Sequence, residues 1–190
     1  MKKNILRSAF ILVLALALVS FTSKTSKKVD VSKSKVTWKG YKVTGSHEGT
    51  INLKSGVIEL EDDKLIGGNF TMDMTSINTT DIKGEYAKKL DGHLKSDDFF
   101  GTDNYPTSTL KITDSESKGK NTYSVTADLT IKGKTHPVTF NISINGSKAT
   151  ANLKIDRTKY DIKYGSSSFF DNLKDKAIDN EFDLTVDLQF

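Results

Sequence analysis

The sequence predicts an all-β protein with a single domain. Apolar and polar residues alternate with period two along most of the chain after residue 28, which is typical of strands with one buried face. Lys132-Gly133-Lys134 and Asn145-Gly146-Ser147 separate two of these runs from the next and favour tight reversals. The chain has 190 residues, the length of one domain with a tail. Together these observations favour an antiparallel meander over a large multilayer α/β enzyme.

Five long alternating runs are the clearest strands, at residues 70–74, 123–131, 138–144, 149–155 and 182–190. Shorter runs at residues 36–43, 50–53, 57–60, 109–113 and 159–164 bring the number of candidate strands to about ten. Strands of this kind bury their apolar face either in a sandwich of two sheets or in one sheet closed into a barrel. Alternation alone leaves both architectures open.

The spacing becomes helical between residues 81 and 100. Tyr86, Leu90 and Leu94 are four residues apart, and Ser96 followed by Asp97 and Asp98 is typical of a helix start. We therefore expect two short helical segments, inserted between strands at residues 82–100.

The N-terminus has the order of a secretory signal peptide. Lys2, Lys3 and Arg7 precede an unbroken apolar run over residues 9–19, and small polar residues follow. Eleven residues rise only about 16 Å as a helix, so a stable membrane span is disfavoured. Residues 1–25 are the expected signal peptide, with cleavage between residues 17 and 26 because three small-x-small triplets end there. The mature domain then begins near Val29, in a periplasmic or secreted protein.

Charge and composition exclude several functions. The chain has 28 Lys+Arg and 24 Asp+Glu, and residues 1–25 hold four of the bases and none of the acids, so the mature protein has 24 of each. Without a net positive charge, nucleic-acid binding is not expected. The absence of cysteine excludes disulfides, thiol catalysis, Cys-ligated metals and a lipoprotein anchor.

The other reactive residue types have ordinary structural explanations. The three histidines are more than 40 residues apart without a paired motif, so no metal site is expected. Ser166-Ser167-Ser168 is typical of a flexible loop, and Asp97-Asp98 of a helix start. We therefore expect a protein that is not an enzyme and that has no resident cofactor.

Several spaced motifs carry a resemblance to a known family. Residues 92–100, Gly-His-Leu-Lys-Ser-Asp-Asp-Phe-Phe, and Tyr105-Pro106 after them resemble the HL-K-S-x-D-F-F and YP pattern of the YceI-like family, also called polyisoprenoid-binding or lipocalin-like proteins. Further matches are His47-Glu48-Gly49 with Gly56, Ser76-Ile77-Asn78-Thr79, residues 127–133 with His136-Pro137-Val138, and residues 155–162. The chain departs from the family at Tyr160-Asp161, where Phe-Gly is more frequent, and at Asp128, where Gly is common.

The resemblance implies an extended antiparallel eight-stranded lipocalin-like barrel over residues 29–190, from an exported bacterial protein. It also implies an apolar lumen for one long-chain amphiphile, such as an isoprenoid quinone, a polyprenyl compound or a fatty amide. The role that the resemblance implies is that of a carrier, scavenger or stress protectant. The alternative is a structural or interaction domain with a core filled by the same side chains, and a homodimer is left open.

Candidate ligand contacts follow from the resemblance and the inward side of the strands. The lumen residues are Trp38, Phe70, Met72, Met74, Leu110, Tyr123, Val125, Leu129, Phe140, Ile142, Leu153, Tyr160, Phe182 and Leu184. His47, His93 and Arg157 are the candidates for the head group. Arg157 is the only arginine after Arg7, so the sequence also favours a planar multi-donor role, such as an ion pair with a nearby Asp that closes the barrel end.

Overall fold

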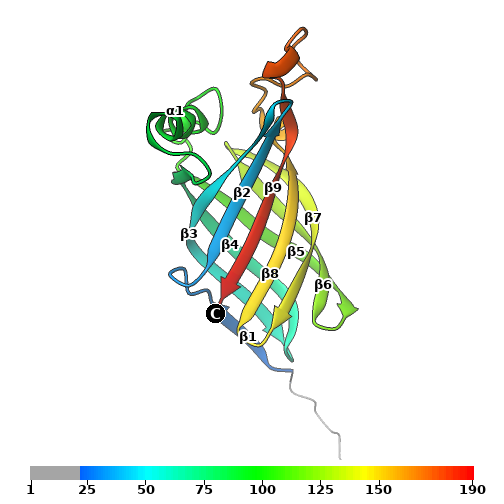
Figure 1. Cartoon of the computed structure of the whole chain (residues 1–190). Coiled ribbons are helices and arrows are strands. Elements are labelled where there is room, and N and C mark those ends of the chain that lie inside the picture. Colours follow the sequence, from blue (N-terminus) through cyan, green and yellow to red (C-terminus); the bar gives the residue numbers. More distant parts are fainter. Residues whose placement is uncertain (1–21) are drawn as a thin grey trace, which may run out of the picture.

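The computed structural model describes residues 22–190, so most of the expected signal peptide lies outside the described residues. The described residues form one antiparallel sheet in the order β1-β3-β2-β9-β8-β7-β6-β5-β4, which closes because β3 also pairs with β4. Its strands are β1 (Lys24–Lys28), β2 (Lys35–Lys42), β3 (Gly45–Glu61), β4 (Lys64–Thr79), β5 (Thr107–Gly119), β6 (Thr122–Ile131), β7 (Lys134–Asn145), β8 (Lys148–Asp156) and β9 (Ile178–Gln189). Strands β2 to β9 make a closed eight-stranded barrel (Figure 1). Of the two architectures that the alternation left open, the chain forms the barrel.

The two ends of the barrel differ. The hairpin end carries the short turns β3/β4, β5/β6 and β7/β8 and the end of β9. The helix end carries helix α1 (Gly84–Lys95), which joins β4 to β5, and the connection 157–177, which joins β8 to β9 (Figure 1). All long insertions therefore gather at one end of the barrel.

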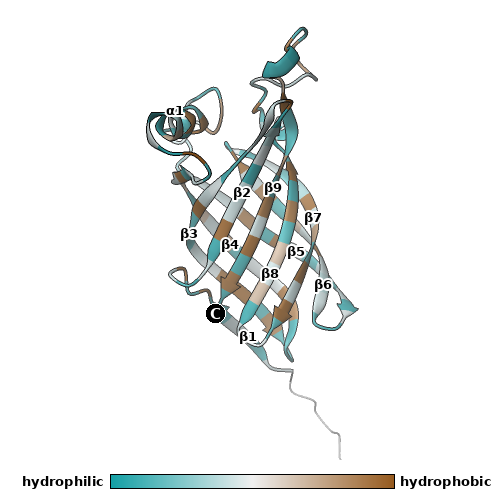
Figure 2. Cartoon of the chain, in the orientation of Figure 1, coloured by the Kyte–Doolittle hydropathy of each residue, from teal (hydrophilic) through white to brown (hydrophobic). Residues whose placement is uncertain are grey.

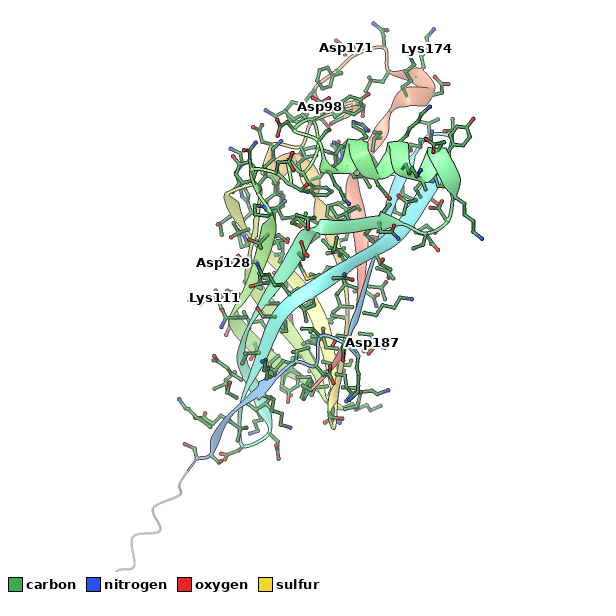
Figure 3. All side chains as sticks on the ribbon, turned by 90° about the vertical axis from the view of Figure 1, so that its left-hand side faces the viewer. Asp98, Lys111, Asp128, Asp171, Lys174 and Asp187 are labelled. Atoms are coloured by element: carbon green, nitrogen blue, oxygen red, sulfur yellow. The ribbon has the colours of Figure 1, made fainter. Side chains whose placement is uncertain are left out.

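The alternation in the sequence becomes the inside and outside of the barrel wall. Strand β8 alternates between exposed and buried residues from Lys148 to Ile155, and Figure 2 shows the strands banded between hydrophilic and hydrophobic residues. Lys111 of β5 and Asp128 of β6 are register partners and lie on the outer surface in Figure 3. Because opposite charges face each other there, Asp128 suits a solvated strand face.

The region of residues 82–100 contains one helix and not two. Helix α1 ends at Lys95 because Ser96 is extended, with ψ at 167°, and its Oγ donates to His93 O at 2.8 Å. The N–H groups of Phe99 and Gly101 then both return to Ser96 O, and Gly101 has a φ of +58°. This closes a single turn over residues 97–100, so the second expected helical segment is a hydrogen-bonded turn.

The expected strand at residues 159–164 is also absent. Asp156 Oδ1 accepts from the Thr158 N–H at 2.9 Å and from its Oγ at 2.6 Å, which starts the 3₁₀ turn η1 (Arg157–Tyr160). Asp161 ends that turn with a φ of +63°. A second 3₁₀ turn, η2 (Lys174–Lys176), precedes β9. The two short runs expected at 50–53 and 57–60 belong to one strand, β3, which has register shifts between Thr50 and Ser55.

Strand β1 was not expected, because Lys24–Lys28 has no apolar alternation. It pairs with Val57–Glu61 of β3, where β2 no longer covers that strand. Ser23 and Asp62 extend the pairing through two hydrogen bonds, of 2.9 and 3.1 Å. The folded domain of the described residues therefore reaches back at least to Ser23. No helix of the described part is long and apolar enough to cross a membrane.

Candidate ligand-binding cavity

An apolar cavity of about 560 Å³ lies inside the barrel and reaches the surface at the helix end. Its walls come from the inward residues of the strands, and α1 with the turn after it contributes to its cover. Of the lumen residues expected from the sequence, those that border it are Trp38, Phe70, Met72, Met74, Leu110, Leu129, Phe140, Ile142, Leu153, Phe182 and Leu184. Contact of these residues with a ligand remains a prediction.

Three expected lumen residues do not border the cavity. Tyr123 and Val125 lie near the β5/β6 turn, and Val125, like Ile58 of β3, is fully buried. Tyr160 lies on η1 with its ring edge-on to His136, at 5.3 Å between centroids. Burial raises the pKa of the Tyr160 hydroxyl to about 12, and this hydroxyl has no partner among the described residues. Part of the inward side of the wall is therefore covered by packed side chains, whereas the rest borders the cavity.

The expected lumen set omitted the cover of the cavity. Leu90 and Leu94 of α1 and Phe99 and Phe100 after it border the cavity and pack against the barrel core. The four-residue spacing of the two leucines was visible in the sequence and placed them on one face of a helix. The spacing did not show which surface this face of the helix covers.

Trp38 lies over a glycine. Gly49 is its register partner on β3, and a Cβ at Gly49 would lie only 2.6 Å from Cζ2 of the indole. Gly49 therefore leaves the room that the indole occupies beside the cavity. A larger residue at Gly49 would clash with this indole and with the backbone carbonyl oxygen of Asn78.

The structure brings His47 and His93 to the helix end, where both border the cavity. His47 Nδ1 lies 2.8 Å from Asp81 Oδ2, which ties β3 to the connection that follows β4. Burial acts to raise the pKa of Asp81, but hydrogen bonds from His47 and from the Glu48 backbone N–H outweigh it and hold this pKa below its usual value. His93 lies between Phe99 and Tyr164, with ring centroids 5.6 and 4.5 Å away.

Arg157 borders the cavity and is 2% exposed. Its guanidinium donates from Nε to Asp179 O at 2.9 Å, from Nη1 to Ile162 O at 2.7 Å and from Nη2 to Ile178 O at 3.0 Å. The partners are backbone carbonyls and not the Asp side chain that the sequence led us to expect. Arg157 therefore joins the two ends of the 163–177 loop, and most of its donors are already used. Its burial lowers the pKa of the guanidinium.

The opening of the cavity lies beside a gap in strand pairing. Gly40 of β2 pairs with Phe182 and Lys42 with Ile178, so residues 179–181 of β9 bulge opposite Tyr41. Gly40 borders the cavity, and a Cβ placed on it would meet nothing within 4 Å. Charged residues of both signs stand around this opening: Lys42, Lys176, Asp175, Asp179 and Glu181.

The fold and the cavity define a class: lipocalin-like closed antiparallel barrels with an apolar interior that opens at one end. A family model described as "YceI-like domain" matches residues 28–190. The chain therefore belongs to the YceI-like family, as its sequence motifs predicted.

Curated relatives match parts of the chain. A UPF0312 protein of Staphylococcus aureus (strain USA300) is 34% identical over 120 residues, which are 57% of this chain and 64% of that protein. A UPF0312 protein of Pseudomonas putida (strain W619) is 35% identical over 88 residues, or 42% of this chain and 45% of that protein. The chain thus spans less than two thirds of the length of these relatives.

Solved structures share the fold. BcnA of Burkholderia cenocepacia is 25% identical, with a TM-score of 0.68 over 84% of this chain and 98% of that chain. A polyisoprenoid binding domain from Saccharophagus degradans is 15% identical, with a TM-score of 0.58 over 85% and 95% of the two chains. At that identity the second likeness shows the barrel fold alone.

Proposed function

We propose that this protein is an exported bacterial lipid carrier or scavenger that holds one long-chain amphiphile in its barrel, without catalysing a reaction on it. The observation that carries the proposal is the apolar cavity, because a barrel that served only as an interaction domain would gain stability from filling that space. The polyisoprenoid binding domain from Saccharophagus degradans, which shares the barrel fold, supports the same ligand class.

The size of the cavity favours a ligand with one chain. At about 30 Å³ for each group the size of a water molecule, 560 Å³ holds about 19 such groups. Burying that many methylene-sized groups contributes about 15 kcal/mol at about 0.8 kcal/mol each. Association costs about 4 to 15 kcal/mol, so a chain that fills the cavity offsets this cost, whereas one half as long does not reliably do so. We expect affinity to increase with chain length up to about twenty carbons.

Blocking the cavity tests this function. Gly40→Phe places an aromatic side chain into the opening. The backbone of Gly40 is not in the left-handed region, so the substitution does not strain it. Trp38 is the only tryptophan and borders the cavity, so its fluorescence reports binding. We expect Gly40→Phe to weaken binding of phytol, a branched C20 alcohol, at least about tenfold, or 1.4 kcal/mol.

Gly92→Phe is the matched control. Gly92 is an exposed position of α1 that does not border the cavity, and a Cβ there also meets nothing within 4 Å. The control should bind phytol as the wild type does. Equal affinities of wild type and Gly40→Phe would show that the cavity is not the binding site.

Export is part of the proposal and rests on the signal-like N-terminus of the sequence. Strand β1 pairs with β3, and Ser23 is hydrogen-bonded to Asp62 in the turn after β3. These contacts favour cleavage before Ser23, after Ala17 or Thr22. Cleavage after Thr25 would remove part of a strand that stabilises the hairpin end.

A further inference from the structure

Ser108 places a hydroxyl in the apolar wall of the cavity. It lies near the start of β5, is 6% exposed and borders the cavity, and its Oγ makes no hydrogen bond to any described residue. The unpartnered polar side-chain atoms that are sealed from solvent in the described part are Trp38 Nε1 and Tyr160 OH. Ser108 Oγ is not sealed in this way, so it is open to the cavity.

The surroundings of this hydroxyl are apolar. Its register partner on β4 is Met72, and Leu110 is the next inward residue on β5; both border the cavity. A hydroxyl in such surroundings is unfavourable unless it has a partner, and most buried polar side chains have one. The wall supplies no hydrogen-bond partner for Ser108 Oγ, so the molecule that fills the cavity would supply it.

The charges around the cavity do not favour an ion. Lys42, Lys176 and Arg157 border it together with three acids, Asp175, Asp179 and Glu181, so the two signs balance. Arg157 is already committed to three carbonyl oxygens. A charged group beside Ser108 and Met72 would lose its hydration without gaining a counter-ion.

We propose that the bound amphiphile carries a small uncharged oxygen function, a hydroxyl or a carbonyl, that lies inside the cavity and hydrogen-bonds Ser108 Oγ. The inference rests on the proposed function and narrows its ligand class. It makes Ser108 a specificity-determining residue. It also places a polar group of the ligand within the cavity, in addition to any polar contact at the opening.

A matched series of three ligands tests this proposal: phytane, phytol and phytanic acid share one branched C20 carbon skeleton and differ at one end, which is an alkyl end in phytane, an allylic alcohol in phytol and a carboxylic acid in phytanic acid. Their affinities for the wild type and for Ser108→Ala are measured from Trp38 fluorescence. We expect the wild type to bind phytol at least about fivefold more tightly than phytane, and phytanic acid no more tightly than phytol. In Ser108→Ala the advantage of phytol over phytane disappears, while the affinity for phytane is unchanged.

Two controls separate ligand recognition from folding. Thr139→Ala removes an exposed hydroxyl from β7 and should bind all three ligands as the wild type does. Ser108→Ala without ligand should unfold at the temperature of the wild type or slightly above it, because the lost hydroxyl had no partner.

Phytol binding that is as tight in Ser108→Ala as in the wild type would overturn the role of Ser108. Tighter binding of phytanic acid than of phytol by the wild type would overturn the uncharged ligand class. If none of the three ligands bound the wild type, the proposed function itself would fail.

Discussion

Replacing Arg157 with alanine tests how the helix end is held together. The guanidinium makes one fully buried and two partly buried hydrogen bonds to backbone carbonyls. A hydrogen bond from a charged donor contributes about 1.5 to 3 kcal/mol, and less where water reaches it. Removing all three should lower the free energy of unfolding by about 3 to 5 kcal/mol.

Lysine at this position should not restore the lost stability. Its ammonium is a compact point charge and cannot span three carbonyls as a planar guanidinium does. Arg157→Lys should therefore remain at least about 2 kcal/mol less stable than the wild type. Arg157 is the only arginine among the described residues, so no other guanidinium there can take its place.

The assay is urea unfolding followed by Trp38 fluorescence, with limited trypsin digestion alongside it. Arg157 joins Ile162 to Ile178 and Asp179, so its loss should free the loop between them and speed tryptic cleavage after Lys163, Lys174 and Lys176, whose side chains are already exposed. Figure 3 shows Lys174 at the outer tip of this loop. A loss of stability below about 1 kcal/mol, with ligand affinity abolished, would refute this structural role of Arg157. Arg157 would then be a contact for the head group of the ligand.

Three further predictions follow from the same geometry. Ile58→Ala, at a fully buried position that does not border the cavity, should cost about 2 to 5 kcal/mol, whereas Phe140→Ala, beside the cavity, should cost less; equal losses in urea unfolding would indicate a filled core. The pKa of Asp81 lies below its usual value in the folded state, so the hydrogen bond from His47 stabilises the protein above about pH 4 and is lost as the pH falls through the folded pKa. The stability difference between wild type and Asp81→Asn should thus shrink between pH 7 and pH 3, and a constant difference would contradict this coupling. If the protein is exported as proposed, N-terminal sequencing of the mature form should find a start at or before Ser23; a start at Ser26 would show that β1 is dispensable.

The sequence determined which residues face inward but not where the barrel is hollow. Val125 and Phe140 are register partners on neighbouring strands, and both were expected to line the lumen. Val125 is fully buried and does not border the cavity, whereas Phe140 does. Period-two alternation is the same at both positions, because it reports the side of a strand and not the distance across a closed barrel.

The contacts at the helix end also depend on closure of the barrel. Asp81 meets His47 from 34 residues away, and Arg157 meets carbonyl oxygens, which every residue carries. Neither pairing leaves a pattern in the sequence. Motif resemblance succeeded where spacing could not, since it identified residues 92–100 as part of the family's pattern before their role as a cover for the cavity was known.

Extraction of the purified protein with organic solvent, followed by mass spectrometry, shows whether the barrel holds a lipid. We expect about one single-chain lipid per wild-type molecule, with an uncharged hydroxyl or carbonyl oxygen, and almost none in Gly40→Phe. The Gly92→Phe protein should release as much lipid as the wild type. Absence of lipid from the wild type, or equal amounts from wild type and Gly40→Phe, would contradict a ligand held in the barrel.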